Sequence, residues 1–360
     1  MTMKIIRFLQ PALFLAASLL MGCSTDEGNG GRQEVSRTAI VPTAVVNALE
    51  TSRANSLSGP LQGTSFPQST DNVFAVTDYC TTTSSPTSIS GFDYGVAYFH
   101  NEPVNSNANG ELSFNIEQYY PTVGRLYFYA YSPVMPEMTT DTGYQNGSAV
   151  GAPTVTFDIS GGLKDILWAR HDDGIELAGP GVTQPQPSFK FAHKLQQLQF
   201  KFVKGGDFPS GCKVSAIHIQ GNPKDASDDG NKLKDRATLN LSDGTVAYAS
   251  SKNGVDNFVH KLTSAKLWDI DAGDLSGCYV FRPIQHLRLS FEVDMDPAKN
   301  PGRNIRTYSA DVTLVGAQTD VGGRSYLITV TFGGGIDVKI KVMEENGWKP
   351  CTIDRQEIGK

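Results

Sequence analysis

The feature that most restricts the fold of this sequence is a regular alternation of apolar and polar residues, in runs separated by turn-forming residues. The runs at 287–293, 326–332 and 336–342 alternate without interruption. Because successive side chains of a strand point to opposite faces, a period of two predicts strands with one buried and one solvated face. Such half-buried strands are typical of antiparallel sandwiches. We therefore expect an all-β fold.

Further strands are predicted where β-branched and aromatic residues cluster between turn residues. Asn109-Gly110 and Asp243-Gly244 are signals for tight hairpin turns. The additional strands are expected at 73–79, 92–99, 112–116, 155–159, 165–170 and 213–219, and on both sides of Asp243-Gly244. Helix signals are weak and restricted to 44–50 and 261–270. The sequence therefore predicts sheets joined by short turns.

The run at 125–131 differs from the others because both of its faces are apolar or aromatic. Leu126, Phe128 and Ala130 share one face, and three tyrosines occupy the other. A strand covered on both faces belongs in the middle of a sheet, so we expect a central strand here. We interpret the tyrosines as packing residues; a platform on which carbohydrate stacks is the other interpretation.

The alternation changes phase at Gln196-Gln197. Phe189, Phe191, His193 and Leu195 share one face, whereas the following apolar residues (Leu198, Phe200 and Phe202) share the other. A slip of one residue moves side chains to the opposite face. Either a bulge lies here or the chain passes from one sheet or domain to another. We place a domain boundary here, with β-sandwich domains at 54–195 and 196–360.

The beginning of the chain has the pattern of an export signal. Lys4 and Arg7 precede an apolar run of about ten residues, which is too short to span a bilayer. Gly22-Cys23, with Leu20 three positions before the cysteine, resembles a bacterial lipobox, in which the cysteine is acylated. We expect a lipoprotein signal peptide at 1–22 with lipidation of Cys23. A cut near Ala16-Ala17-Ser18 is the alternative.

Residues 23–53 are expected to form a lipidated tether that carries a removable first strand. The stretch 23–31 has the composition of a flexible linker, and 38–49 is apolar and β-branched. Pro42 restricts such a strand to the edge of a sheet, because proline cannot donate to a ladder.

No constellation in the sequence is typical of catalysis. The net charge is −6 without a basic stripe, so a nucleic-acid partner is not expected. Phosphate-binding, nucleophile-elbow and zinc-protease motifs are missing, and the six histidines are scattered. The loop from Asp225 partly matches a calcium loop, but Arg236 stands where a bidentate glutamate is needed. We expect no catalytic residue, metal or cofactor, and no enzyme activity.

Four cysteines follow Cys23 and lie far apart in the sequence. An exported protein can oxidise them, and four cysteines allow three pairings. The sequence leaves one disulfide and buried thiols as alternatives for Cys80, Cys212, Cys278 and Cys351.

Several motifs, taken in their order along the chain, resemble the fimbrillin family of Gram-negative anaerobes. They are the lipobox ending at Cys23, Thr51-Ser52-Arg53-Ala54, Tyr119-Tyr120-Pro121, the Leu-Tyr-Phe-Tyr-Ala-Tyr-Ser-Pro stretch at 126–133, Asp-Ile-Leu-Trp-Ala at 165–169 and Phe-Ala-His-Lys-Leu at 191–195. The resemblance implies two tandem transthyretin-like antiparallel β-sandwich domains and export as an outer-membrane lipoprotein. It also implies cleavage after an arginine by a trypsin-like protease. Cleavage releases the first strand, and a C-terminal strand of another subunit fills the groove.

The resemblance assigns roles to particular residues of this chain. Cleavage maps to Arg53, with Arg37 and Arg32 as alternatives. The candidate donor strand is the run at 335–343, whose pocket-filling residues are Ile336, Val338, Ile340 and Val342. An ordinary edge strand in its own domain is the other interpretation of this run.

We expect a structural subunit or accessory of a surface fimbria that serves adhesion. The expected partners are other fimbrial subunits, the processing protease, the outer membrane through the lipid, and a host or bacterial surface ligand. The alternative function is a monomeric glycan-binding surface lipoprotein, suggested by the tyrosines of 125–131 together with Trp168, Trp268 and Trp348. Shaft, anchor and tip roles remain open at this level.

Overall fold

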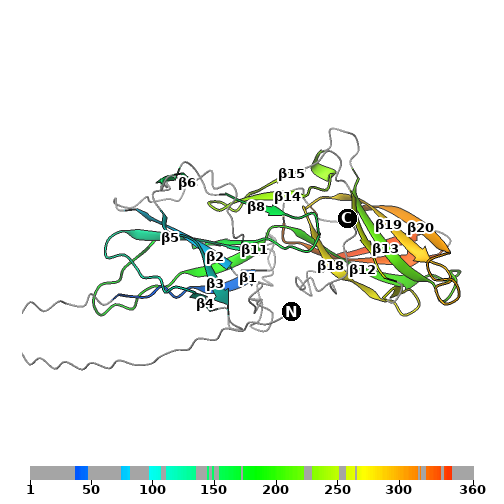
Figure 1. Cartoon of the computed structure of the whole chain (residues 1–360), viewed down its shortest axis with the longest axis horizontal. Coiled ribbons are helices and arrows are strands. Elements are labelled where there is room, and N and C mark those ends of the chain that lie inside the picture. Colours follow the sequence, from blue (N-terminus) through cyan, green and yellow to red (C-terminus); the bar gives the residue numbers. More distant parts are fainter. Residues whose placement is uncertain are drawn as a thin grey trace, which may run out of the picture. The chain divides into compact units, whose positions relative to one another are not determined.

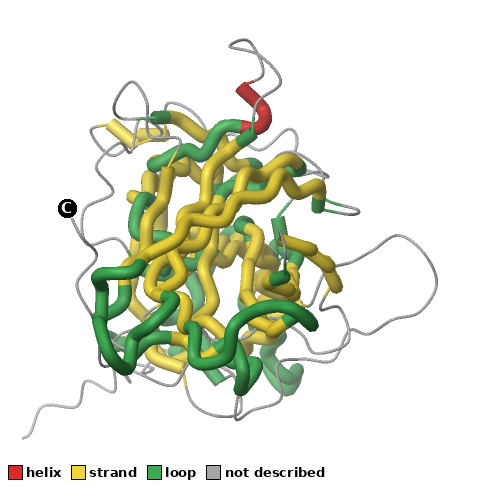
Figure 2. The backbone as a smooth tube through the Cα atoms, turned by 90° about the vertical axis from the view of Figure 1, so that its right-hand side faces the viewer, coloured by secondary structure: helices red, strands yellow, loops and turns green. Residues whose placement is uncertain are grey.

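A computed structural model describes the parts of the chain that carry the sheets. The described residues are 37–47, 74–81, 97–106, 111–134, 144–145, 148–149, 154–171, 173–222, 229–250, 257–263, 266–314, 317, 322–333 and 336–342. They belong to one compact unit, Arg37–Lys360. Strands dominate them, and the helical turn η2 (Asp229–Asn231) is their one helix (Figure 2). The all-β prediction is confirmed. Within these residues, no helix is long and apolar enough to cross a membrane.

The first large sheet has the strand order β1-β11-β9-β5-β2-β3-β4, with β10 also paired to β5. Its strands β2, β3, β5 and β11 are labelled in Figure 1. Its strands are β1 (Thr43–Asn47), β2 (Phe74–Thr81), β3 (Ala97–Ser106), β4 (Leu112–Phe114), β5 (Arg125–Ser132), β9 (Leu167–Arg170), β10 (Ile175–Glu176) and β11 (Ser188–His193). The neighbouring strands of this sheet pair antiparallel, except that β1 pairs parallel with β11. The weak helix signal at 44–50 is wrong over the residues that form β1.

Strand β5 lies in the middle of this sheet, as predicted. Leu126, Phe128 and Ala130 face one hydrophobic cluster, whereas the tyrosines of the opposite face pack into another. The side chains of Tyr127, Tyr129 and Tyr131 are 4%, 2% and 0% exposed. They are packing residues, because an aromatic platform for carbohydrate must be open to solvent.

Two further sheets enclose the largest hydrophobic cluster of the described residues. One has the order β18-β12-β21-β22, and the other has the order β16-β13-β19-β20 with β17 paired to β13. Their strands are β12 (Gln196–Lys204), β13 (Lys213–Gly221), β16 (Asn257–Lys261), β17 (Trp268–Asp269), β18 (Leu275–Phe281), β19 (His286–Asp294), β20 (Ile305–Thr313), β21 (Ser325–Phe332) and β22 (Ile336–Val342). Phe200 of β12 meets Phe291 of β19 edge to face, with ring centroids 5.7 Å apart. The facing aromatic rings therefore join the two sheets.

A smaller sheet, β15-β14-β8, joins strands that are remote in sequence. It comprises β8 (Thr154–Asp158), β14 (Arg236–Asn240) and β15 (Val246–Ala249), and a separate ribbon pairs β6 (Tyr144–Gln145) with β7 (Ser148–Ala149). The predicted hairpin at Asp243-Gly244 connects β14 to β15, and Gly244 has a φ of 70°. Glycine adopts that left-handed backbone conformation readily, because it has no Cβ.

The phase slip at Gln196-Gln197 marks a change of sheet. Strand β11 ends at His193 in the first sheet, and β12 begins at Gln196 in another. Of the two sequence interpretations, the passage between sheets is therefore correct. The division into domains at 54–195 and 196–360 stays a prediction, and β8 pairs across that boundary with β14.

Two pairs among the described strands are parallel, in contrast to the antiparallel expectation. They are β1 with β11 and β12 with β21. Both join strands far apart in the chain, because a parallel pair requires a long crossover connection. The described cysteines Cys212 and Cys278 are buried and form no disulfide among the described residues.

Candidate strand-exchange site

The segment 37–47, which we call the closing segment, lies between the two ends of the first sheet. Its residues alternate in burial: Ile40, Pro42 and Ala44 are buried, whereas Val41 and Thr43 are exposed. This period of two is that of a strand with one face on the core. The predicted first strand between Thr38 and Leu49 is therefore present, with β1 as its regular part.

On one side, the closing segment pairs with β11. The parallel register runs from Thr43 opposite Ser188 to Asn47 opposite Ala192. The amide of Thr43 donates to the carbonyl of Pro187 at 3.0 Å, one residue before β11 begins. The edge of β11 is thereby covered.

On the other side, the same segment bonds to the chain around β4. The amide of Ile40 donates to Gln118 O at 2.8 Å, and the amide of Leu112 donates to Pro42 O at 2.9 Å. Isolated bridges pair Thr43 with Glu111 and residue 39 with residue 119. Since β4 and β11 otherwise end the strand order, the closing segment joins the two ends of the sheet.

Two buried side chains fix the closing segment to the core. Ile40 and Ala44 are each 3% exposed and belong to the cluster that contains Leu112, Tyr120 and Phe189. Full burial of an isoleucine side chain stabilises by roughly 1.5–3 kcal/mol. Loss of the segment would expose these neighbours and uncover two strand edges, which are templates for pairing with another chain.

Arg37, an alternative cleavage residue, is exposed at the start of the closing segment. Its guanidinium lies 5.8 Å from the centre of the Tyr119 ring. The hydroxyl of Tyr119 donates to the Glu117 carboxylate, and this hydrogen bond raises the pKa of Tyr119. A cut after Arg37 would leave the rest of the closing segment joined to the chain. Cys23, Arg32 and Arg53 lie outside the described residues.

The candidate donor strand forms β22 at the edge of its own sheet. It pairs antiparallel with β21, from Ile336 opposite Phe332 to Val342 opposite Tyr326. One edge of β22 is thus paired within the chain. The structure describes the backbone of Ile336, Val338, Ile340 and Val342, and their role in another subunit stays a prediction.

Gln186 is a residue of this site that the sequence analysis did not single out. Its side-chain oxygen accepts from the amide of Val41 at 2.7 Å, and its side-chain nitrogen donates to Ala39 O at 3.2 Å. The hydroxyl of Tyr120 donates to Pro185 O beside it at 2.8 Å. The alternation of glutamine with proline at 184–187 is the signal in the sequence, because prolines interrupt a ladder and amide side chains can continue it.

The described tryptophans do not form an open aromatic surface. Trp168 is half-buried, with the ammonium of Lys194 lying 4.6 Å from its ring centre. Trp268 is also half-buried, and its ring centroid lies 5.4 Å from that of Phe202. Trp348 lies outside the described residues. The tyrosine and tryptophan argument for a glycan-binding surface therefore finds no support in the described residues.

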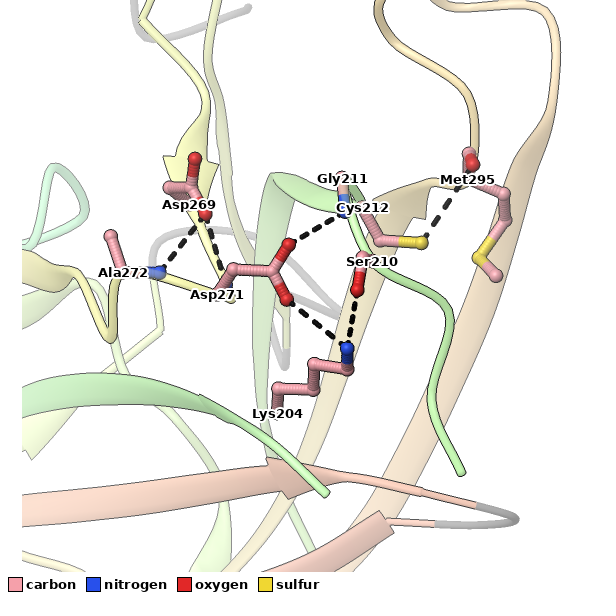
Figure 3. A network of polar contacts seen from close by, with 8 residues as sticks. All are labelled: Lys204, Ser210, Gly211, Cys212, Asp269, Asp271, Ala272 and Met295. Atoms are coloured by element: carbon pink, nitrogen blue, oxygen red, sulfur yellow. Dashed lines mark hydrogen bonds and ion pairs between the residues drawn. The ribbon is translucent and has the colours of Figure 1, made fainter. Parts of the chain in front are cut away.

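A polar network outside this site ties loops together (Figure 3). The carboxylate of Asp271 accepts from the amide of Gly211 at 2.7 Å and lies 3.6 Å from Lys204 Nζ. Asp269 accepts from the amide of Asp271 at 2.9 Å. These carboxylates bond to backbone amides of turns, so we interpret the network as structural. Its remaining members are Ser210, Cys212, Ala272 and Met295.

Comparisons with known proteins agree with this architecture. A family model described as fimbrillin-like matches residues 68–344. A candidate cell adhesion protein from Bacteroides uniformis is 16% identical, with a TM-score of 0.53 over 85% of this chain and 97% of that chain. A fimbrial protein from Bacteroides vulgatus is 15% identical, with a TM-score of 0.50 over 86% of this chain and 100% of that chain. At these identities the structural likeness shows the fold alone. No curated protein matches the chain.

Proposed function

Because this chain belongs to the fimbrillin-like family, we propose that it is a structural subunit or accessory of a surface fimbria, assembled by strand addition and serving adhesion. The observation that carries the proposal is the closing segment. It joins both ends of the first sheet and buries Ile40 and Ala44 in its core. A strand in that position can be exchanged for a strand of another subunit, because main-chain bonds and alternate pockets provide most of the attachment.

Arg53 is the residue at which a trypsin-like protease would start this exchange. It is the only lysine or arginine between the end of β1 at Asn47 and the start of β2 at Phe74. A cut there separates the closing segment from the sheet it completes. A cut after Arg37 or Arg32 would leave that segment connected to β2.

The incoming strand in this proposal is β22 of another subunit. Its apolar residues at 336, 338, 340 and 342 have the spacing of the buried positions at 40, 42 and 44. Donation requires β22 to leave β21, to which it is paired over seven residues. In the accepting subunit the bonds of β22 replace those of the closing segment, so their number there is similar, whereas the donating subunit gives up the ladder between β21 and β22.

Lipidation of Cys23 and export to the outer membrane complete the proposal. Two acyl chains provide stable anchoring, whereas one chain gives marginal binding. Cys23 and the closing segment both precede Arg53. One cut would therefore release the subunit from its lipid and open its groove, and a subunit that escapes cutting would stay as an anchor. The proposed partners are other fimbrial subunits, the protease, the membrane and a surface ligand.

The test is to purify surface material from cells that express the chain and to sequence the N-terminus of each band. A detergent-resistant ladder whose subunits begin at Ala54 is the expected result. Arg53→Ala should leave lipidated monomers in the membrane, whereas the matched variant Arg37→Ala should still form the ladder. Polymers of normal length from Arg53→Ala would refute cleavage at this residue.

A further inference from the structure

We propose that Gln186 is a main-chain clamp that holds whichever extended strand occupies the position of the closing segment. For the chain's own segment, the inference stands on the described contacts. For an incoming strand, which we take to be β22 of a second copy, it rests on the proposed function. The clamp recognises the N–H and C=O groups of an extended backbone, spaced two residues apart.

The two bonds of Gln186 have the geometry of a ladder step. Its oxygen accepts from the amide of Val41 at 2.7 Å and its nitrogen donates to Ala39 O at 3.2 Å. A glutamine amide has the donor and acceptor of a peptide group. Only with its oxygen toward the amide of Val41 and its nitrogen toward Ala39 O does the side chain of Gln186 bond to both groups of the strand. The side chain of Gln186 therefore acts as a peptide unit of a neighbouring strand.

Prolines explain why a side chain is used at this step. Pro185 and Pro187 flank Gln186 and have no amide hydrogen, so the backbone cannot continue the ladder of β11 toward residue 184. The carbonyl of Pro187 still accepts a main-chain hydrogen bond from the amide of Thr43. Gln186 extends the attachment by one more step, to residues 39 and 41.

A neighbouring glutamine makes the same arrangement with a different segment. Gln184 accepts from the amide of Ala178 at 2.7 Å and donates to Glu176 O at 3.0 Å. Here too the partners are the N–H and C=O groups of residues two apart. The repetition shows that Gln-Pro-Gln-Pro forms two side-chain clamps, of which one holds the closing segment and the other holds the end of β10 and the residues that follow it.

The clamp sets a rule for the strand that it accepts. Val41 is 51% exposed, so the clamp contacts its amide while its side chain points to solvent. Side-chain identity at that position is therefore free, but proline is excluded because it has no amide hydrogen. The seven residues of β22, Ile-Asp-Val-Lys-Ile-Lys-Val, contain no proline and meet this rule.

Amide hydrogen exchange of the intact mature chain tests the clamp directly. In Gln186→Ala, exchange at Val41 should become faster by about 3- to 10-fold, the range for one lost hydrogen bond. The amide of Leu112, which donates to Pro42 O, should change less. Gln184→Ala is the matched control: exchange should rise at Ala178 and stay unchanged at Val41. Equal exchange at Val41 in wild type and Gln186→Ala would overturn the proposal.

Strand exchange is tested separately. The chain is nicked at Arg53, and displacement of the closing segment by a synthetic peptide of the whole donor run, residues 335–343, is followed by mass spectrometry. Gln186→Ala should release its own segment faster and retain the peptide for a shorter time, whereas Gln184→Ala should match wild type. If the wild-type segment is never displaced, β22 exchange fails while the Val41 result still decides the clamp. Equal peptide retention in Gln186→Ala would refute the clamp for an incoming strand.

Discussion

Truncation of Ile40 should loosen the closing segment without unfolding the protein. Ile40 is 3% exposed and packs in the cluster of the first sheet. Replacing a buried isoleucine by alanine costs about 2–5 kcal/mol. We take the lower part of this range, about 2–3 kcal/mol, for the expected effect. At 1.4 kcal/mol for each factor of ten, the segment should open about 30- to 150-fold more often.

The assay is amide exchange at Ile40 and Thr43, which donate to Gln118 O and Pro187 O on opposite sides of the segment. Both amides should respond to Ile40→Ala by a similar factor if the segment opens as one unit. Val41→Ala is the matched control, because the side chain of Val41 is 51% exposed. A similar effect of the two substitutions, or no effect of Ile40→Ala, would show that burial in the core does not hold the segment and would refute the reasoning.

Two other predictions concern the sheets themselves. Gly244→Ala should lower the free energy of unfolding by about 1–3 kcal/mol, since φ is 70° and the new Cβ would lie 2.4 Å from the Trp168 ring. Urea denaturation measures this change. The control is Gly206→Ala, which should be close to neutral because a Cβ there meets nothing within 4 Å. Burial lowers the pKa of His260 from its ordinary 6.5, so the unfolded state binds the proton more readily. The contribution of His260 to stability should therefore be complete above about pH 6.5 and decline as the pH falls. His260→Gln should flatten this decline in urea titrations at several pH values, and identical slopes would contradict the assignment.

The period-two pattern was sufficient to predict most strands because one face of each is buried. It also placed β5 in the centre, since Leu126 and Tyr127 begin two apolar faces that both need cover. The change of sheet at Gln196 was visible because a slip moves side chains to the other face. These inferences depend on residues that are neighbours along the chain, where burial leaves a local pattern.

Partners remote in sequence could not be predicted in the same way. Nothing in the alternation of β8 indicates that Val155 pairs with Leu239 of β14, because many apolar strands fit the same face. The parallel pairing of β1 with β11 is likewise a property of the whole topology. The bonds of Gln186 were missed because a side chain that bonds to a distant backbone has no periodic pattern.

The composition of the closing segment explains why exchange would have a direction. Main-chain bonds are similar for any extended strand, so they hold the segment without favouring it over a replacement. The difference lies in the inward side chains. In a register that places Ile340 at the position of Ala44, the incoming strand buries three more carbon groups, worth roughly 2 kcal/mol at about 0.8 kcal/mol each if the cluster widens to admit them. Because Ala44 is small and buried, the closing segment binds the groove less strongly than the incoming strand would. The covalent connection to the rest of the chain is then what keeps the closing segment in place. Cutting that connection at Arg53 would remove the advantage of an intramolecular strand, so the same strand could complete the core before cleavage and be replaced after it.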